Sequence, residues 1–208
     1  MSGVPAMLSR TTRDDGGEWM AYYTFDEMRE RGRAAARSTF QGTDQLLRKS
    51  AQTERRLFDI FLSHSFKDAD AIWGVKNLLE SGGKTVYVDW LDDPLLDRSQ
   101  VTPQTASQLR VRMQQCSSLV YATSPAAANS KWMPWELGYF DGRKGPEAVA
   151  VMPLLRSSAE SVGQEYIGLY PHVDHSDYSK TLRVSRRTFG RLETKTLEGL
   201  VRGSNAYS

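Results

Sequence analysis

Four short apolar segments recur along the middle of the chain, separated by longer amphipathic stretches. They are LFDIFLS (57–63), TVYVDW (85–90), SSLVYAT (117–123) and AVAVMPLL (148–155). The first three are rich in β-branched and aromatic residues, and near-continuous apolar runs of this length are typical of strands covered on both faces. The pattern therefore predicts four buried strands of a parallel sheet.

The stretches between these segments predict helices. In residues 65–83 apolar side chains recur at helical spacing, and a Gly-Gly pair ends the pattern. A second helix is expected to begin at Pro103, directly after the capping residue Thr102. A third contains SKWMPWELGYFDG (130–142). Strands and helices in alternation predict an α/β domain, a doubly wound parallel sheet with right-handed crossovers.

The two flanks differ in character from this middle part. Residues 1–56 favour one or two charged helices broken near Gly42, and residues 176–208 favour a short helix and a polar tail. We therefore expect an N-terminal helical extension (1–56), an α/β domain (57–175) and a C-terminal extension (176–208). The middle carries 10 basic and 14 acidic side chains, whereas the last segment carries 7 and 3. A basic flank can hold nucleic acid, but so small an excess is more typical of a solvated face.

Composition narrows the class of protein. The 208 residues, 39% of them hydrophobic, suit one domain with extensions. The first 30 residues contain no apolar run that is long enough for a signal peptide, and no later run could span a membrane. The single cysteine, Cys116, excludes an internal disulfide and agrees with a reducing compartment. We expect a soluble, cytoplasmic protein without a membrane partner.

Several motifs that would indicate other chemistry are incomplete. SGGKT (81–85) has Leu78 where a phosphate-binding loop needs glycine, and an expected strand follows it instead of a helix. HVDH (172–175) has the residue types of a metal site but lacks a convincing third ligand. No G-x-S-x-G elbow occurs, and no G-x-G-x-x-G follows a strand. The sequence therefore favours neither a serine hydrolase nor a Rossmann dehydrogenase, and we expect no metal ligands.

Polar residues follow the predicted strands at one edge of the sheet. SHS (63–65) follows the first strand, Asp89 and Trp90 are expected to end the second, and Glu136 begins the helix after the third. The carboxyl ends of parallel strands open on the same edge, so these residues are expected to meet at a cleft.

Glu136 stands among two tryptophans, a tyrosine and a phenylalanine. A charged residue in such surroundings is usually paired or used in function. Pro134 indicates that Glu136 lies in the first turn of its helix, where the dipole favours the ionised form against the desolvation that raises the pKa. We expect an ionised carboxylate. A core aromatic cluster, with Glu136 merely paired to a basic residue, stays open as an alternative.

Three of these segments carry a resemblance to a known family. FDIFLSHS, the VYVDW strand with its loop, and NSKWMPWELGYFDG resemble, in this order and spacing, the signature segments of a prokaryotic Toll/interleukin-1 receptor (TIR) domain. The resemblance covers the middle of the chain and implies a flavodoxin-like sheet. It also implies cleavage of NAD⁺ at the nicotinamide–ribose bond by one glutamate, which falls on Glu136. The family's aromatic residues four positions and one position earlier fall on Trp132 and Trp135. The loop after the second strand is longer and more acidic than the usual pattern.

This reaction needs one carboxylate. The bond to nicotinamide breaks with a neutral leaving group and leaves an oxocarbenium-like ribose, which a nearby carboxylate stabilises. No general acid is needed because the departing pyridine already carries the charge. We therefore expect Glu136 to be catalytic and Trp132 to stack on nicotinamide or adenine. The further residues expected to bind substrate are Ser63, His64, Ser65, Asp89 and Trp135, with Arg110, Arg112 and Lys131 as candidate diphosphate partners. Structural roles for His64, as a hydrogen-bonded strand end, and for Asp89, as a loop cap, stay open.

The resemblance further implies how the protein works. NAD⁺ would be the substrate, with no separate cofactor, and the product would be linear, cyclic or conjugated ADP-ribose acting as a signal, or NAD⁺ would be depleted, in anti-phage defence. It implies self-association, for which we expect the loop 91–102 and the N-terminal helices at the contact, and a separate effector or sensor protein. Two alternatives stay open. One is a non-enzymatic interaction module, and the other is a nuclease or nucleotide cyclase acting through the basic flanks, although nucleic acid is not the expected partner.

Overall fold

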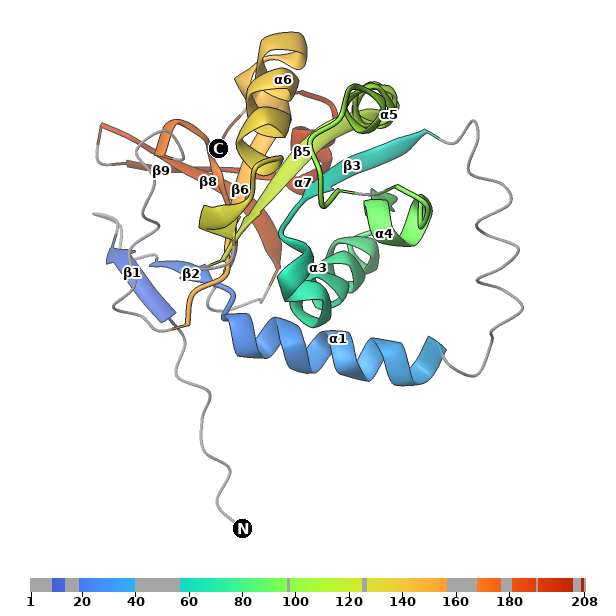
Figure 1. Cartoon of the computed structure of the whole chain (residues 1–208). Helices are drawn as coiled ribbons and strands as arrows, with labels where there is room; N and C mark the ends of the chain where they lie inside the picture. The colour runs from blue at the N-terminus through green and yellow to red at the C-terminus, as the bar shows by residue number, and fades with distance from the viewer. Residues whose placement is uncertain are drawn as a thin grey trace.

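The protein is described here from a computed structural model (Figure 1). The described residues are 9–13, 19–39, 57–96, 98–124, 127–156, 168–176, 181–189, 191–203 and 207. Within these parts of the chain, no helix is both long and apolar enough to cross a membrane.

Five parallel strands form the centre of the sheet, in the order β4-β3-β5-β6-β7. They are β3 (Phe58–Ser63), β4 (Val86–Tyr87), β5 (Cys116–Thr123), β6 (Val149–Pro153) and β7 (His172–His175). Numbered along the chain, this order is 2-1-3-4-5, the flavodoxin-like arrangement. The predicted fold class and the four predicted strands are thus confirmed, and β7 is a fifth.

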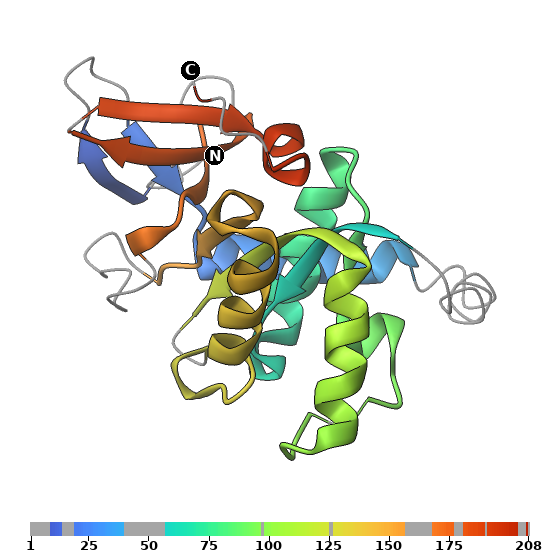
Figure 2. The same ribbon diagram turned by 90° about the horizontal axis from the view of Figure 1, so that it is seen from above.

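Helices cover both faces of this sheet, as Figures 1 and 2 show. In β5, Val120 and Ala122 point into one core and Leu119 and Tyr121 into the other, because successive side chains of a strand alternate between faces. The helices that contribute to the first core are α1 (Phe25–Thr39), α3 (Ala69–Ser81) and α7 (Leu197–Val201). Those that contribute to the second are α5 (Pro103–Gln114) and α6 (Met133–Lys144). Each of the three predicted helices of the middle segment is present, so both faces are buried as the apolar runs required.

Helix α1 lies against α3 at unusually close range. A Cβ added to Gly32 would lie 1.8 Å from the backbone oxygen of Asp70, and one added to Gly74 would lie 1.9 Å from that of Met28. Only glycine permits such an approach of two helix backbones. The N-terminal helix is therefore fastened to the α/β domain at this crossing.

The flanks contain strands that the sequence analysis did not predict. The N-terminal flank forms β1 (Ser9–Arg13) and β2 (Trp19–Tyr22) before helix α1, and the C-terminal flank forms β8 (Leu182–Thr188) and β9 (Arg191–Thr196) before α7. Both β2 and β8 pair antiparallel with β7, so the sheet has nine strands within the described residues (Figure 2, blue and red arrows). Strands β1, β8 and β9 carry few apolar residues, and β2, although apolar, is only four residues long, so none of them gives the long apolar run that marks a buried strand. The break expected near Gly42 lies outside the described residues.

The second predicted strand is shorter than expected. β4 ends at Tyr87, and Asp89 begins a short helix, α4 (Asp89–Asp92). The Asp92 carboxylate accepts a hydrogen bond from the Val88 backbone N–H at 2.8 Å, which turns the chain out of the sheet. Asp89 and Trp90 therefore lie in a helical turn directly after the strand, still at its carboxyl end.

Candidate active site

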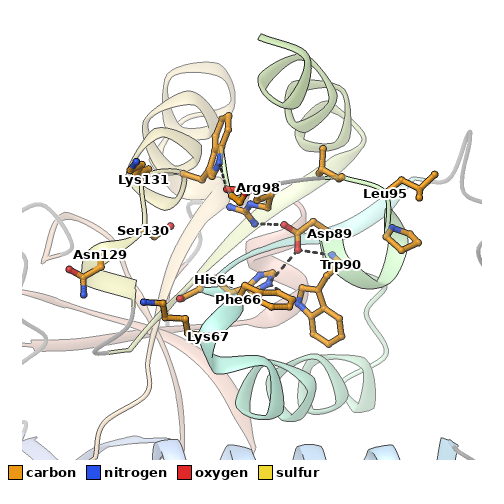
Figure 3. Close-up of a pocket in the computed structure, with 15 residues that line it drawn as sticks. His64, Phe66, Lys67, Asp89, Trp90, Leu95, Arg98, Asn129, Ser130 and Lys131 are labelled. Carbon is orange, nitrogen blue, oxygen red and sulfur yellow. Dashed lines mark hydrogen bonds and ion pairs between the residues drawn. The ribbon is translucent and has the colours of Figure 1, made fainter. Parts of the chain in front are cut away.

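A pocket of about 680 Å³ opens at the carboxyl edge of the sheet (Figure 3). It lies beside the ends of β3 and β5, where the strand order reverses and where open α/β sheets bind ligands. The residues that line it are His64, Ser65, Phe66, Lys67, Asp89, Trp90, Pro94, Leu95, Leu96, Arg98, Ser99, Asn129, Ser130, Lys131 and Trp132. The expected cleft is therefore present at the expected edge.

Glu136 lies beneath this pocket and is fully buried. It occupies the first turn of α6, as Pro134 indicated. One carboxylate oxygen accepts a hydrogen bond from the Ser63 hydroxyl at 2.6 Å, and the other pairs with the Arg98 guanidinium at 2.5 Å. Among the described residues that line the pocket, neither Glu136 nor Ser63 appears. The candidate catalytic carboxylate is thus held just out of reach of the pocket.

Arg98 stands between Glu136 and the pocket. Its guanidinium pairs with two buried carboxylates at once, through one terminal nitrogen with Asp89 and through the other with Glu136. Figure 3 shows its side chain turned inward towards Asp89. The Arg98 side chain is 16% exposed, whereas that of Glu136 is not exposed at all. Arg98 therefore links the carboxyl ends of β4 and β5 and forms part of the pocket wall.

His64 has a defined tautomer at this edge. Its Nδ1 lies 2.8 Å from the Leu62 carbonyl oxygen, and its Nε2 lies 2.9 Å from the indole nitrogen of Trp90. A carbonyl only accepts and an indole N–H only donates, so Nδ1 carries the proton and Nε2 accepts. Burial lowers the pKa of His64, although Asp89, 3.3 Å from Nε2, opposes this. We infer a neutral ring that is oriented by Leu62 and Trp90.

Burial and pairing act against each other on the two carboxylates. Desolvation raises the pKa of Glu136, while the Arg98 charge and the Ser63 hydroxyl lower it, and the net direction is upward. For Asp89, burial also opposes ionisation, but the neighbouring His64 ring, the Arg98 guanidinium and the Trp90 backbone N–H together hold its pKa below the usual range. Arg98 is therefore the main group that opposes the upward shift of the Glu136 pKa.

The structure brings most of the predicted site residues together. Ser63, His64, Asp89 and Glu136 form one buried network through Arg98, and Ser65 and Trp132 lie on the pocket wall.

Trp135 faces elsewhere. It packs edge-to-face against Trp132, stacks on Tyr139 and carries Arg110 over its ring, and it is absent from the described pocket lining. The indole N–H of Trp132 donates to the backbone oxygen of Arg98 at 3.1 Å. Trp135 therefore supports Trp132 from behind.

Of the three basic residues considered for a diphosphate, Lys131 lines the pocket. Arg112 does not: its Nε and one terminal nitrogen donate to Asp93 in a fork with two 2.6 Å bonds, and its other terminal nitrogen donates to Gln115 at 3.0 Å. Asp93 also accepts the Tyr87 hydroxyl at 2.7 Å. This fork anchors the start of the long loop and leaves Arg112 with a structural role.

Sequence reasoning missed Arg98 and Lys67, and although it placed Trp90 at the cleft it gave this residue no role there. Arg98 lies in an acidic loop without periodicity, and its partners lie 9 and 38 residues away. One signal was available. Arg98 lies in the loop that follows Asp89, at the same edge of the sheet as Glu136, and a buried glutamate needs a positively charged partner.

Comparison with known proteins agrees with this geometry. No protein-family model matches the chain. The chain is 55% identical over 122 residues to "Probable 3' cyclic ADP-D-ribose synthase ThsB'" of Bacillus cereus (strain MSX-D12), covering 58% of this chain and 62% of the relative. It is 29% identical over 86 residues to "Putative cyclic ADP-D-ribose synthase TIR2" of Cytobacillus dafuensis, covering 41% and 23%. The chain thus spans less than two thirds of the length of either relative.

The sheet is flavodoxin-like, which is the arrangement that the resemblance to TIR domains implied. The similarity to these two bacterial proteins confirms the resemblance that the three sequence segments indicated.

Proposed function

We propose that this protein cleaves the nicotinamide–ribose bond of NAD⁺ and converts the remainder into a cyclic ADP-ribose, with Glu136 as the catalytic carboxylate. The observation that carries the proposal is a fully buried carboxylate directly beneath a pocket at the switch point of the sheet. The printed names of the two relatives, both cyclic ADP-D-ribose synthases, support the product class.

The pocket has the chemistry that a dinucleotide requires. Trp132 offers an aromatic face for a base, and Lys67 and Lys131 at the wall offer positive charge for the diphosphate. Ser65 and Ser130 offer hydroxyl groups for ribose or phosphate oxygens. A volume of about 680 Å³ falls within the range of ordinary small-molecule sites.

The chemical step needs no redox partner. The C1′–N bond breaks, its electron pair goes to the pyridinium nitrogen, and neutral nicotinamide leaves. The Glu136 carboxylate stabilises the positive charge that develops on the ribose. A nucleophilic group of the same ADP-ribose then adds to C1′ and loses its proton to solvent, which closes the ring; water in its place would give linear ADP-ribose.

The test is incubation of the purified protein with NAD⁺, followed by chromatography and mass spectrometry of the nicotinamide and adenine-containing products. The proposal expects nicotinamide together with a product that is one water lighter than ADP-ribose. Glu136→Ala should give neither product. Turnover that persists in Glu136→Ala would contradict the role of Glu136, and inertness at high protein concentration would favour a non-enzymatic module.

Self-association belongs to the same proposal. Three large apolar side chains stand exposed at and near the pocket: Phe66, Leu95 at 98% exposure, and Val101. A second copy of the chain is the partner that we expect to cover them, and light scattering together with activity across a concentration series tests it. We expect the product to act as a signal for a separate effector in anti-phage defence.

A further inference from the structure

The arrangement around Glu136 contains an obstacle to the reaction. A carboxylate that stabilises a ribose cation must touch the ribose, yet both oxygens of Glu136 are occupied and its side chain is fully buried. The group that occupies the pocket side is the Arg98 guanidinium, which itself lines the pocket.

We propose that Arg98 is a positioning residue that shields Glu136 in the free protein and moves its guanidinium onto the diphosphate of the bound dinucleotide. This exchange uncovers Glu136 for the ribose. The inference rests on the proposed function and deepens it, because it names the part of the substrate that opens the site.

In the free protein, ion pairs with two carboxylates hold the Arg98 guanidinium in place. One guanidinium lies between the carboxylates of Asp89 and Glu136, and both carboxylates are almost completely withdrawn from solvent. Removing one charge of such a group leaves its partners buried and uncompensated. Arg98 can therefore leave Glu136 only if its other terminal nitrogen stays paired with Asp89, an anion receives the nitrogen that moves, and hydrogen-bond donors satisfy Glu136.

The substrate supplies both replacements. A diphosphate presents anionic oxygens that match the planar fork of an arginine as well as a carboxylate does. The ribose hydroxyls are donors that can satisfy the oxygen of Glu136 that the guanidinium vacates. Lys67 and Lys131 lie on the same pocket wall and draw the diphosphate towards this side.

The movement is confined to one side chain. The backbone of Arg98 is fixed, because its carbonyl oxygen accepts the indole N–H of Trp132 at 3.1 Å. The start of the loop is fastened by the Asp93–Arg112 fork, and its end by Thr102, whose hydroxyl caps α5 through the Thr105 backbone N–H at 3.1 Å. A rotation of the Arg98 side chain about this fixed backbone suffices, with no opening of the fold.

The test compares two substrates that share one glycosidic bond. Nicotinamide riboside has the nicotinamide–ribose bond of NAD⁺ but no diphosphate. Wild type, Arg98→Gln and Arg98→Lys are assayed on both for kcat/KM of nicotinamide release. The matched control is Lys131→Gln, which removes a pocket cation that makes no described contact with Glu136.

At a pH above the activity midpoint of each variant, Arg98→Gln is expected to lower kcat/KM for NAD⁺ at least about tenfold, the loss of one charge-assisted hydrogen bond, while kcat/KM for the riboside stays level or rises. Arg98→Lys should lie between wild type and Arg98→Gln. Lys131→Gln should also lower kcat/KM for NAD⁺, but without the shift of the activity midpoint to higher pH that loss of the Arg98 charge produces. Equal losses on both substrates in Arg98→Gln would overturn the inference and leave Arg98 as a fixed support of Glu136.

A binding measurement needs no turnover and separates this inference from the proposed function. ADP carries the diphosphate without the reactive bond, and calorimetry compares its affinity for wild type and for Arg98→Gln. We expect about tenfold weaker binding in Arg98→Gln, or an intermediate loss in Arg98→Lys if the glutamine variant does not fold. Unchanged ADP affinity would overturn the inference, whereas absence of NAD⁺ cleavage by wild type would contradict the proposed function.

Discussion

Glu136 and Asp174 are two fully buried carboxylates with closely similar partners. Each accepts a hydrogen bond from a serine hydroxyl and pairs with an arginine. For Glu136 the partners are Ser63 and Arg98, and for Asp174 they are Ser185, at 2.9 Å, and Arg183, at 2.9 Å.

The two sites differ in where the arginine comes from. Arg183 lies directly opposite Asp174 in the β7–β8 ladder, so the pair is a cross-strand contact built into the sheet. Arg98 comes from a loop, pairs with a second carboxylate and forms part of a pocket wall. Burial and ion pairing alone therefore do not distinguish a candidate active site. A candidate active site is distinguished by an adjoining pocket and by an ion-pair partner that a substrate can replace.

The largest expected effect comes from removing the arginine that pairs with Asp174, which is the structural one of the two carboxylates. Arg183→Ala leaves the buried Asp174 carboxylate without its main counter-charge, which costs about 3–5 kcal/mol of folding free energy. Urea denaturation followed by circular dichroism measures it. Nicotinamide release per folded molecule should stay at the wild-type level, and its loss in the folded fraction would contradict the assignment of Asp174 as structural.

The close crossing of helices α1 and α3, which involves no polar side chain, provides a stability effect to compare with those of the two buried ion pairs. Gly74→Ala places a methyl group against the Met28 backbone oxygen, and we expect a loss of about 1–3 kcal/mol in folding free energy as α1 and α3 are forced apart. Gly142→Ala, in α6, is the control because a Cβ there meets nothing within 4 Å. Equal stability of the two variants would show that the helix crossing is looser than described.

The pH dependence of cleavage tests the charge balance at Glu136. Because the ionised form is the active one and burial raises its pKa, kcat/KM for NAD⁺ should rise with pH through a midpoint above the usual glutamate range. Arg98→Gln removes the positive charge that lowers this pKa, while the Asp89 charge that raises it remains, so the midpoint should move to higher pH.

The contribution of Glu136 to folding stability changes with pH in the direction opposite to that of kcat/KM. The folded state binds the Glu136 proton more readily than the unfolded chain does, so the contribution of Glu136 is greatest below the unfolded pKa. It falls as the pH rises towards the folded pKa.

A midpoint of kcat/KM that does not move in Arg98→Gln would show that Arg98 does not control the ionisation of Glu136.

The smallest effect concerns His64. Trp90→Phe removes the indole N–H that occupies Nε2, which frees this nitrogen to bind a proton and donate to Asp89. The pKa of His64, lowered in the wild type by burial, should rise. Titration of the histidine ring protons by NMR measures it, with His172, whose pKa is lowered by burial to about 4, as an internal reference. An unchanged His64 pKa would contradict the inferred tautomer.

The sequence predicted the centre of the fold well, for a physical reason. Strands buried on both faces, such as β3 and β5, must be apolar throughout, and this leaves a strong signal. Strands at the margin, such as β8, are half exposed and stabilised by pairing with β7, and their polar sequence gave no such signal. The α1–α3 crossing depends on two glycines 42 positions apart, which no local pattern connects.

The sequence predicted the main polar residues of the site, but not the arginine that pairs with two of them. Strand ends and helix starts placed Ser63, Asp89 and Glu136 at one edge, and the structure brings them into one network. The shielding arginine was not predictable, because its place depends on the path of an irregular loop. The resemblance to TIR domains implied Trp135 as a site residue, and in the structure its ring packs behind Trp132.

The most direct measurement of the central claim replaces each of the two buried carboxylates by its amide. Glu136→Gln and Asp174→Asn both keep shape and remove charge, and both are assayed for nicotinamide release from NAD⁺ per folded molecule. We expect a loss of about 10²–10³-fold in Glu136→Gln and little change in Asp174→Asn. Wild-type turnover in folded Glu136→Gln, or an equal loss in both variants, would contradict it.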